Sequence, residues 1–282
     1  MDKIETVGKS VIQYGKHSDR IYLMKLARED VRQILRVMNR MAQDHGFTKL
    51  FAKVPADVAN EFKTDGFRPE AQIPGFYNGE EEVMFMGKYF DEERKNLTKE
   101  EKERLQKVFK ASIDKRIGHI EEPELPSNME CRIARKEDIM DMSEIFKKVF
   151  ETYPFPIHDH AYLKETMEKH VVYFGVWEDG KLVAVSSSET DPGSSSVEMT
   201  DFATLPEKRG AGLATFLLRK MDEEMTKKGF KTAYTIARAM SFGMNITFAK
   251  RLYRFGGVLI HNTNIGGNIE SMNVWYKPLA SE

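Results

Sequence analysis

The sequence contains a single cysteine, Cys131, among its 282 residues. One thiol excludes a disulfide within the chain and a metal site built from several cysteines. An excess of positive charge is also absent, because 43 Lys and Arg residues are balanced by 44 Asp and Glu residues, which leaves a formal net charge of −1. A chain without an overall basic field is not expected to bind nucleic acid, so we expect a small molecule as its partner.

Long apolar segments are missing as well. No run approaches the roughly 20 apolar residues of a membrane-spanning helix, and residues 1–11 are too polar for a signal peptide. His158 and His160 lie close together, but their spacing does not match a metal site. We therefore predict a cytoplasmic location, no membrane partner and no metal.

The order of predicted elements divides the chain into two domains and a linker. Residues 1–90 are predicted to form strands at 5–26, a helix at 30–43 closed by Gly46, a strand at 49–54, a short helix at 55–63 and a strand at 83–89. Residues 91–128 contain a charged surface helix and then the acidic, proline-bearing stretch 121–126, which is typical of a linker. Residues 129–282 alternate strands and helices and form the second domain.

A glycine-containing loop joins a predicted strand, residues 197–205, to a predicted amphipathic helix. The loop consists of Arg209, Gly210, Ala211, Gly212, Leu213 and Ala214. Glycine lets backbone N–H groups turn toward a ligand without obstruction by a Cβ atom, and a helix N-terminus favours negative charge at the same place. An anion such as a pyrophosphate is expected here. A Walker loop is excluded because Gly-Lys-Ser/Thr is absent, and residues 206–209 separate the strand from the glycines too widely for a dinucleotide loop.

The loop carries the Arg/Gln-x-x-Gly-x-Gly/Ala signature of the GNAT acetyltransferase superfamily, with Arg209, Gly212 and Ala214 in the required positions. Residues 129–282 resemble this superfamily, which implies an α/β fold with a mixed sheet and acetyl-CoA as cosubstrate. The resemblance also implies that the strand end Phe202, Ala203 and Thr204 pairs with the pantetheine arm. The backbone N–H of Thr204 would polarise the thioester carbonyl. The alternative is an ordinary core strand in which Phe202 only packs.

Segment 245–257 resembles the Asn…Ala…Tyr…Gly pattern of the same superfamily. The resemblance implies that Tyr253 is the general acid for the departing thiolate and that Asn245 contacts the coenzyme. Asn245 lies one residue earlier than the superfamily pattern, and an aromatic residue at position 253 also suits a helix that faces a core.

An ammonium substrate must lose a proton before it can attack a thioester, which calls for a carboxylate or a relayed water. The candidates are Glu189, Glu198 and Asp201. Alternation along the strand places Glu198 on one face and Asp201 on the other, and the sequence does not decide which face is the pocket.

The ending 262–277 and the stretch Tyr153-Pro154-Phe155-Pro156 resemble the β-lysine acetyltransferases. This resemblance implies transfer to the distal amine of β-lysine, which would give a neutral compatible solute. The acceptor pocket is expected to contain Tyr153, Phe155, Glu189, Asp201, Arg238, Asn245, Glu270, Asn273 and Trp275. The asparagines would alternatively form turns, and Trp275 would alternatively pack in the core.

Several landmarks recur at similar spacing in the two domains, among them Ala59 and Ala249, and Gly66 and Gly256. The first domain is therefore predicted to be a degenerate half GNAT domain. The position of its pyrophosphate loop falls at residues 26–31, which contain no glycine. We expect this α+β domain to be structural or to form a homodimer. The alternatives to the whole interpretation are a protein or polyamine acetyltransferase and a non-catalytic coenzyme A binding module.

Overall fold

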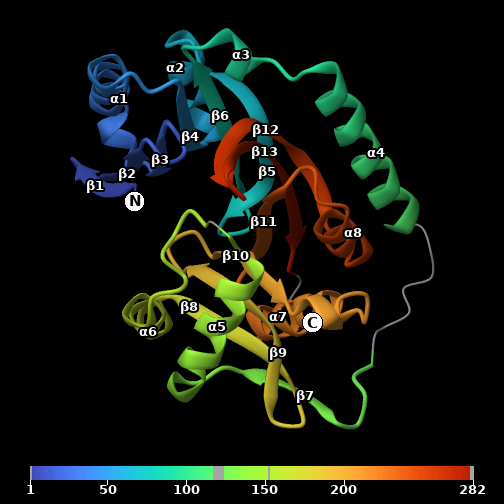
Figure 1. Ribbon diagram of the computed structural model, residues 1–282. Helices are drawn as coiled ribbons and strands as arrows, with labels where there is room; N and C mark the ends of the chain where they lie inside the picture. Colours follow the sequence, from blue (N-terminus) through green and yellow to red (C-terminus); the bar gives the residue numbers. More distant parts are fainter. Residues whose placement is uncertain (1, 117–123, 152, 280–282) are drawn as a thin grey trace.

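The computed structural model describes residues 2–116, 124–151 and 153–279. Its strands join into one 13-stranded sheet in the order β1-β2-β3-β4-β6-β5-β12-β13-β11-β10-β9-β8-β7 (Figure 1). The sheet contains both parallel and antiparallel neighbours, as the predicted mixed α/β fold requires. Much of the predicted linker stretch, residues 117–123, lies outside the described residues.

The N-terminal half provides the strands at one end of the sheet. It comprises β1 (Lys3–Val7), β2 (Ser10–Gly15), β3 (Arg20–Lys25), α1 (Val31–His45), β4 (Lys49–Pro55), α2 (Ala59–Thr64), β5 (Arg68–Tyr77) and β6 (Glu81–Tyr89). Helix α1 buries Val31, Ile34 and Met38 at helical spacing and ends at Gly46, whose φ of 63° is the left-handed conformation that glycine favours. Strand β5 is absent from the sequence prediction because Pro69, Pro74 and Gly75 interrupt its pattern.

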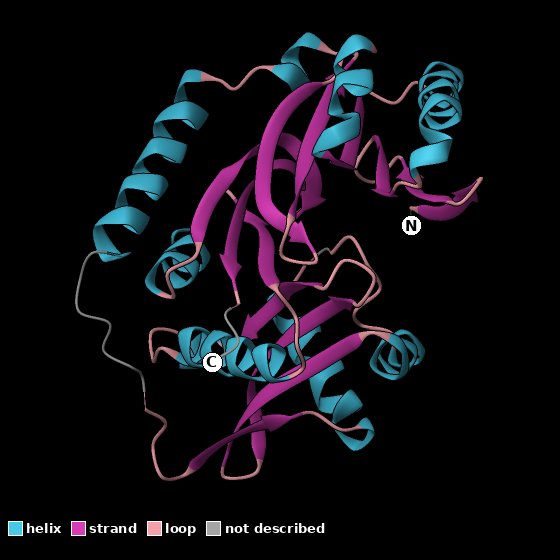
Figure 2. Ribbon diagram, turned by 180° about the vertical axis from the view of Figure 1, so that it is seen from behind, coloured by secondary structure: helices cyan, strands magenta, loops and turns pink. Residues whose placement is uncertain are grey.

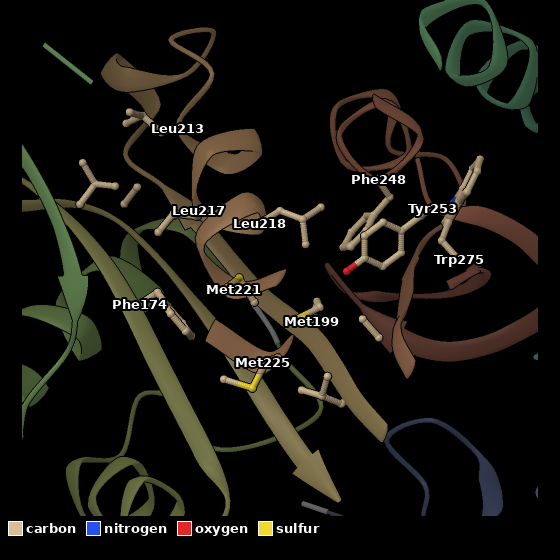
Figure 3. Packing of buried hydrophobic residues seen from close by; sticks show 14 of the residues in the cluster. Phe174, Met199, Leu213, Leu217, Leu218, Met221, Met225, Phe248, Tyr253 and Trp275 are labelled. Atoms are coloured by element: carbon tan, nitrogen blue, oxygen red, sulfur yellow. The ribbon is translucent and has the colours of Figure 1, made fainter. Parts of the chain in front are cut away.

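The C-terminal half follows two connecting helices, α3 (Glu92–Lys95) and α4 (Lys99–Arg116). It comprises β7 (Met129–Ile133), α5 (Ile139–Val149), α6 (His160–Lys169), β8 (Val171–Glu178), β9 (Lys181–Asp191), β10 (Ser196–Thr204), α7 (Leu213–Lys227), β11 (Thr232–Arg238), α8 (Phe242–Lys250), β12 (Arg254–Ile265) and β13 (Asn268–Pro278). Its main core is formed by α7 packing on β10 and by α8, with Leu217, Met199 and Phe248 fully or almost fully buried (Figure 3).

The same pattern of strand pairing occurs in both halves. In the N-terminal half, β3 runs parallel to β4, and β4, β6 and β5 follow as antiparallel neighbours. In the C-terminal half, β10 runs parallel to β11, and β11, β13 and β12 follow in the same way. This topology supports an internal repeat, while the origin of the first half as a half GNAT domain stays a prediction.

The two halves meet where β5 pairs with β12, at Gly257 and Ala71. A Cβ atom at Gly257 would lie 2.3 Å from the carbonyl oxygen of Glu70, so the backbones approach too closely for any other residue. Next to this contact, the buried Lys49 ammonium donates to Glu70 at 2.9 Å and to the carbonyl of Ile260 at 2.7 Å. The halves therefore form one continuous sheet.

Helix α4 is predicted from its charge to lie on the surface, and most of it is exposed. One side nevertheless packs beside α8, as both views show (Figure 1, Figure 2). Phe109 lies with its ring centre 4.8 Å from that of Phe255, and the Arg104 guanidinium lies 4.4 Å from the ring of Phe242. The connection between the halves thus also supports a helix of the C-terminal half.

Candidate active site

Strands β10 and β11 separate partway along their length. They pair only from Ser196 to Glu198, opposite Thr232 to Tyr234. Beyond this point β10 bulges between Thr200 and Ala203, where Asp201 takes a φ of 53°. A bulge bends and twists a strand, so β10 leaves β11 with backbone groups free to pair with an extended ligand.

The glycine loop follows the end of β10. Gly210 and Gly212 have φ values of 86° and 75°, and Gly212 is the N-cap of α7. The first N–H groups of a helix have no partner inside the helix, so those after Gly212 are available to an anion. Arg209 is tied back to the strand end through a 3.4 Å hydrogen bond from its Nε to the Thr204 carbonyl. The loop therefore presents a helix N-terminus after two left-handed glycines, and its role as a pyrophosphate site stays a prediction.

A cavity lies between the separated strands, the segment after α5 and the N-terminal half. Its wall includes the predicted residues Tyr153, Phe155, Glu189, Glu198, Asp201, Phe202 and Arg238. The N-terminal half contributes Gln13, Arg20, Tyr22, Met24, Phe51 and Lys53. The expected acceptor wall at Tyr153 and Phe155 is thus part of this cavity, and both halves of the chain build it.

Two carboxylates lie side by side in the cavity wall. Glu198 in β10 is the direct neighbour of Glu189 in β9 and of Tyr234 in β11. Burial, together with the nearby Glu189 charge, raises the pKa of Glu198 to about 8, against an opposing effect from Lys53. Burial and the Asp201 charge also raise the pKa of Glu189. The Glu189 side chain is 45% exposed. This exposed part borders the cavity, while protein atoms surround the rest of the side chain.

Asp201 reaches the same face because of the bulge. Strict alternation would place it with Met199 against α7, but its left-handed backbone turns the side chain to the cavity side. There it accepts hydrogen bonds from the Tyr153 hydroxyl and the Ser187 hydroxyl, both at 2.5 Å. Burial raises its pKa, and these hydrogen bonds oppose that rise. Asp201 is therefore held by two hydroxyl donors, whereas Glu198 interacts with one hydroxyl, that of Tyr234, and has a pKa raised to about 8.

Several predicted acceptor residues are not brought to the cavity. Glu270 is absent from the cavity wall and forms a salt bridge with Arg238, whose Nε donates to it at 2.9 Å. Asn273 and Trp275 are buried, and both donate to Oδ1 of Asn245, at 2.7 and 2.8 Å. Residues 245, 273 and 275 therefore hold α8 against the sheet, and their expected role in binding substrate or coenzyme stays a prediction.

Tyr253 is also placed differently from the expectation. It is fully buried, it is absent from the cavity wall, and its hydroxyl donates to Asp222 at 2.7 Å. Lys277 donates to the other oxygen of Asp222, also at 2.7 Å. Figure 3 shows the Tyr253 ring between Phe248 and Trp275 with its hydroxyl toward α7. This geometry favours the packing role of Tyr253 over that of a general acid.

Thr204 is likewise absent from the cavity wall, whereas the bulge residues Thr200, Asp201 and Phe202 line it. The expected role of the Thr204 N–H stays a prediction, and the bulge residues are further candidates because they line the cavity. Phe202 also packs edge-on against Phe248, with 5.6 Å between ring centres. It contributes both to the core and to the cavity.

Sequence reasoning missed the cavity residues of the N-terminal half. Arg20, Tyr22 and Met24 alternate along β3 and so share one face. That pattern predicts a strand face but does not reveal what the face meets. The pairing of β5 with β12, together with contacts such as that of Arg20 with Asn262, brings this face to the active site.

Comparison with known proteins identifies the family. Residues 139–256 match the Acetyltransferase (GNAT) family. The chain is 39% identical to the β-lysine N(6)-acetyltransferase of Methanococcus maripaludis over 98% of this chain and 99% of that protein. The chain belongs to the GNAT acetyltransferase family. This acetyltransferase is also 30% identical to the β-lysine N(6)-acetyltransferase of Methanosarcina mazei, over 88% of the chain and 97% of the relative.

A further relative of this acetyltransferase is the N-acetyltransferase YodP of Bacillus subtilis, 34% identical over 76% of each chain. Among solved structures, a ribosomal L7/L12 α-N-protein acetyltransferase in complex with coenzyme A aligns with a TM-score of 0.50 and 10% identity, covering 57% of this chain and 99% of that one. This likeness shows the fold alone. Within residues 2–116, 124–151 and 153–279, no helix is long and apolar enough to cross a membrane.

Proposed function

We propose that this acetyltransferase transfers the acetyl group of acetyl-CoA to the distal (N6) amine of β-lysine. The observation that carries the proposal is the 39% identity to a β-lysine N(6)-acetyltransferase over both halves of the chain. Both halves also build the cavity. A relative that shared only the C-terminal half would support a GNAT fold but not a common acceptor.

The residues near the point where β10 and β11 separate are suited to bind acetyl-CoA. The pyrophosphate would bind to the loop from Arg209 to Ala214, where the unpaired N–H groups of α7 and the positive end of the helix favour an anion. The pantetheine arm would pair with the free backbone edge of β10 beyond Glu198. These placements leave the acetyl group beside the bulge and the cavity.

Glu198 would act as the general base. The amine of a lysine-like acceptor has a pKa near 10.4 and arrives mostly as an ammonium. A carboxylate whose pKa is about 8 is closer to that value than an ordinary carboxylate, so proton transfer costs less free energy. The amine nitrogen then attacks the thioester carbon, and a backbone N–H at the bulge stabilises the negative oxygen that forms.

The C–S bond breaks as the amide forms, and the sulfur leaves as the thiolate of coenzyme A. A thiol has a pKa of about 8.5, so its thiolate is a stable leaving group that needs little help from a general acid. As the amide forms, its nitrogen releases a second proton, which passes through water to the thiolate, and the first proton, held by Glu198, is lost to solvent. This order of steps needs no general acid, which agrees with the hydrogen bond that the Tyr253 hydroxyl donates to Asp222.

The test is a coenzyme A release assay with a panel of amines. We expect the highest kcat/KM for β-lysine and lower values for α-lysine, spermidine and a lysine-containing peptide. A higher kcat/KM for spermidine or the peptide would instead support a polyamine or protein acetyltransferase. Absence of release with every amine, despite coenzyme A binding, would support the non-catalytic alternative.

We also propose that the product serves as a compatible solute in the cytoplasm. Acetylation removes one of the two positive charges of β-lysine, so the remaining ammonium and carboxylate leave no net charge. Homodimer formation remains a separate prediction, and the molar mass of the protein in solution would test it.

A further inference from the structure

A buried cation lies in the cavity wall that the N-terminal half provides. Arg20 of β3 is only 6% exposed, and its Nη1 donates to the Asn262 carbonyl at 2.6 Å and to the Thr263 hydroxyl at 3.0 Å. Its Nε is buried and has no hydrogen-bond partner. Among the described residues, no carboxylate lies within ion-pair distance of this guanidinium.

An unpaired buried charge is costly, because desolvation is not offset by an opposite charge. Burial lowers the pKa of Arg20 to about 10, so the side chain still carries its charge at neutral pH. The rings of Tyr22 and Phe51 lie 5.2 and 5.5 Å from the guanidinium carbon and stabilise it in part. Its remaining N–H donors are suited to a carboxylate, which a guanidinium binds through two parallel hydrogen bonds.

Asn262 provides a second unpaired group in the same wall. Its side-chain oxygen Oδ1 is buried without a hydrogen-bond partner, and the residue is only 1% exposed. It lies within the irregular segment of β12 between Leu259 and Thr263. The Asn262 oxygen is suited to accept a hydrogen bond from an amino group, and the Arg20 guanidinium is suited to bind a carboxylate. The two residues together therefore match a ligand that carries both groups close together.

The other cations near the cavity are less suitable for a carboxylate. Arg238 is already paired with Glu270. The ammonium of Lys53 lies 5.9 Å from the ring centre of Tyr234, and its charge lowers the pKa values of Glu189 and Glu198. Lys53 therefore acts on the acidic side of the cavity, whereas Arg20, whose charge interacts with that of Asp2 at longer range, has no carboxylate within ion-pair distance among the described residues.

We propose that Arg20 binds the carboxylate of the acceptor and that Asn262 Oδ1 accepts a hydrogen bond from the neighbouring amino group. This inference rests on the proposed function and assigns the N-terminal half a direct part in choosing the substrate. The β-amino acid end of the acceptor is held by Arg20 and Asn262. The distal amine is then directed to Glu198 and the thioester.

The experiment compares β-lysine with 1,4-diaminopentane, which has the same two amines but no carboxylate. The wild-type protein should favour β-lysine in kcat/KM. Arg20→Met should lower kcat/KM for β-lysine by about 10- to 100-fold, mainly through KM, because a charge-assisted hydrogen bond is lost. It should change the value for 1,4-diaminopentane by less than about threefold, and Arg20→Lys should restore part of the preference.

Two controls accompany these variants. Arg28→Met removes an exposed arginine of the same half that is paired with Asp57, and it should leave both substrates unaffected. Lys53→Met tests the competing cation. An unchanged KM for acetyl-CoA shows that the cofactor site is intact. If Arg20→Met does not fold, the wild-type protein with the carboxamide of β-lysine should show the same loss.

Equal losses on both substrates in Arg20→Met, or a selective loss in Lys53→Met instead, would overturn the role of Arg20. A wild-type protein that does not distinguish β-lysine from 1,4-diaminopentane or from the carboxamide would overturn it too. Failure of the wild-type protein to acetylate β-lysine at all would instead overturn the proposed function.

Discussion

Glu198 shows how one residue acquires its chemistry from its position in the sheet. The sequence places three carboxylates near the pocket, and only the strand register makes Glu198 and Glu189 direct neighbours. Burial and this like charge raise the pKa of Glu198 to about 8 from its ordinary 4.5. The side chain is therefore protonated below about pH 8, and its basic form increases as the pH rises through that value.

We predict that kcat/KM for β-lysine rises with pH and levels off above about pH 8. Glu198→Gln should lower kcat by about 10²- to 10⁴-fold and remove this rise, because an amide cannot accept the proton. Steady-state kinetics across the pH range measures both effects. Asp201→Asn serves as the comparison, because it removes a neighbouring carboxylate and should keep the rise of kcat/KM with pH. A pH profile that keeps its rise in Glu198→Gln would assign the titration to another group.

Tyr253→Phe distinguishes a packing role from a chemical one. The change removes the hydrogen bond to buried Asp222, so we expect the free energy of unfolding to fall by about 1 to 3 kcal/mol. kcat should stay within about threefold of the wild-type value. Chemical denaturation and single-turnover kinetics measure the two quantities. A fall in kcat of two or more orders of magnitude with unchanged stability would restore Tyr253 as the general acid.

The loop and α7 form the element that local sequence predicted best. Gly46 and Gly212 each mark a helix end, and both have the left-handed backbone that their positions require. Residues within the loop depend on their immediate neighbours, so a short pattern is enough to predict them. The bulge at Asp201 depends on how β10 pairs with β9, and the sequence could not reveal which way that side chain turns.

Arg209→Glu tests this element. Reversal of the charge should weaken coenzyme A binding by about 10- to 100-fold, because a cation near the phosphates is replaced by an anion. Lys227→Glu makes the same reversal at the far end of α7 and should leave binding nearly unchanged. Isothermal titration calorimetry measures both dissociation constants. Equal affinities in the two variants would place the pyrophosphate elsewhere.

The whole molecule differs most from what the sequence could predict. Local patterns predicted most elements and suggested a repeat, but the contact between Gly257 and Ala71 joins residues far apart in the chain. The cavity is built by both halves, and such contacts between distant residues cannot be read from local patterns, which is why Arg20 and Tyr22 were missed. The packing of Tyr253 was not foreseen for a similar reason, since its hydrogen-bond partner Asp222 belongs to another helix.

The repeat also leads to a prediction of stoichiometry. In the N-terminal half, the position of the glycine loop is occupied by Asp30, whose carboxylate accepts hydrogen bonds from the Lys9 N–H at 2.6 Å and the Ser10 hydroxyl at 2.9 Å. This carboxylate would repel a phosphate at that position. Calorimetry should give one coenzyme A per chain, and two equivalent sites would contradict this interpretation.

The most direct test of the arrangement is the position of the acetyl group in the product. The protein is incubated with β-lysine and acetyl-CoA labelled with ¹³C at the carbonyl, and the product is analysed by two-dimensional NMR. If Arg20 holds the carboxylate and Glu198 receives the distal amine, the labelled carbonyl correlates with the methylene at C6. Correlation with the methine at C3, or equal labelling of both nitrogens, would contradict the proposed orientation of the substrate.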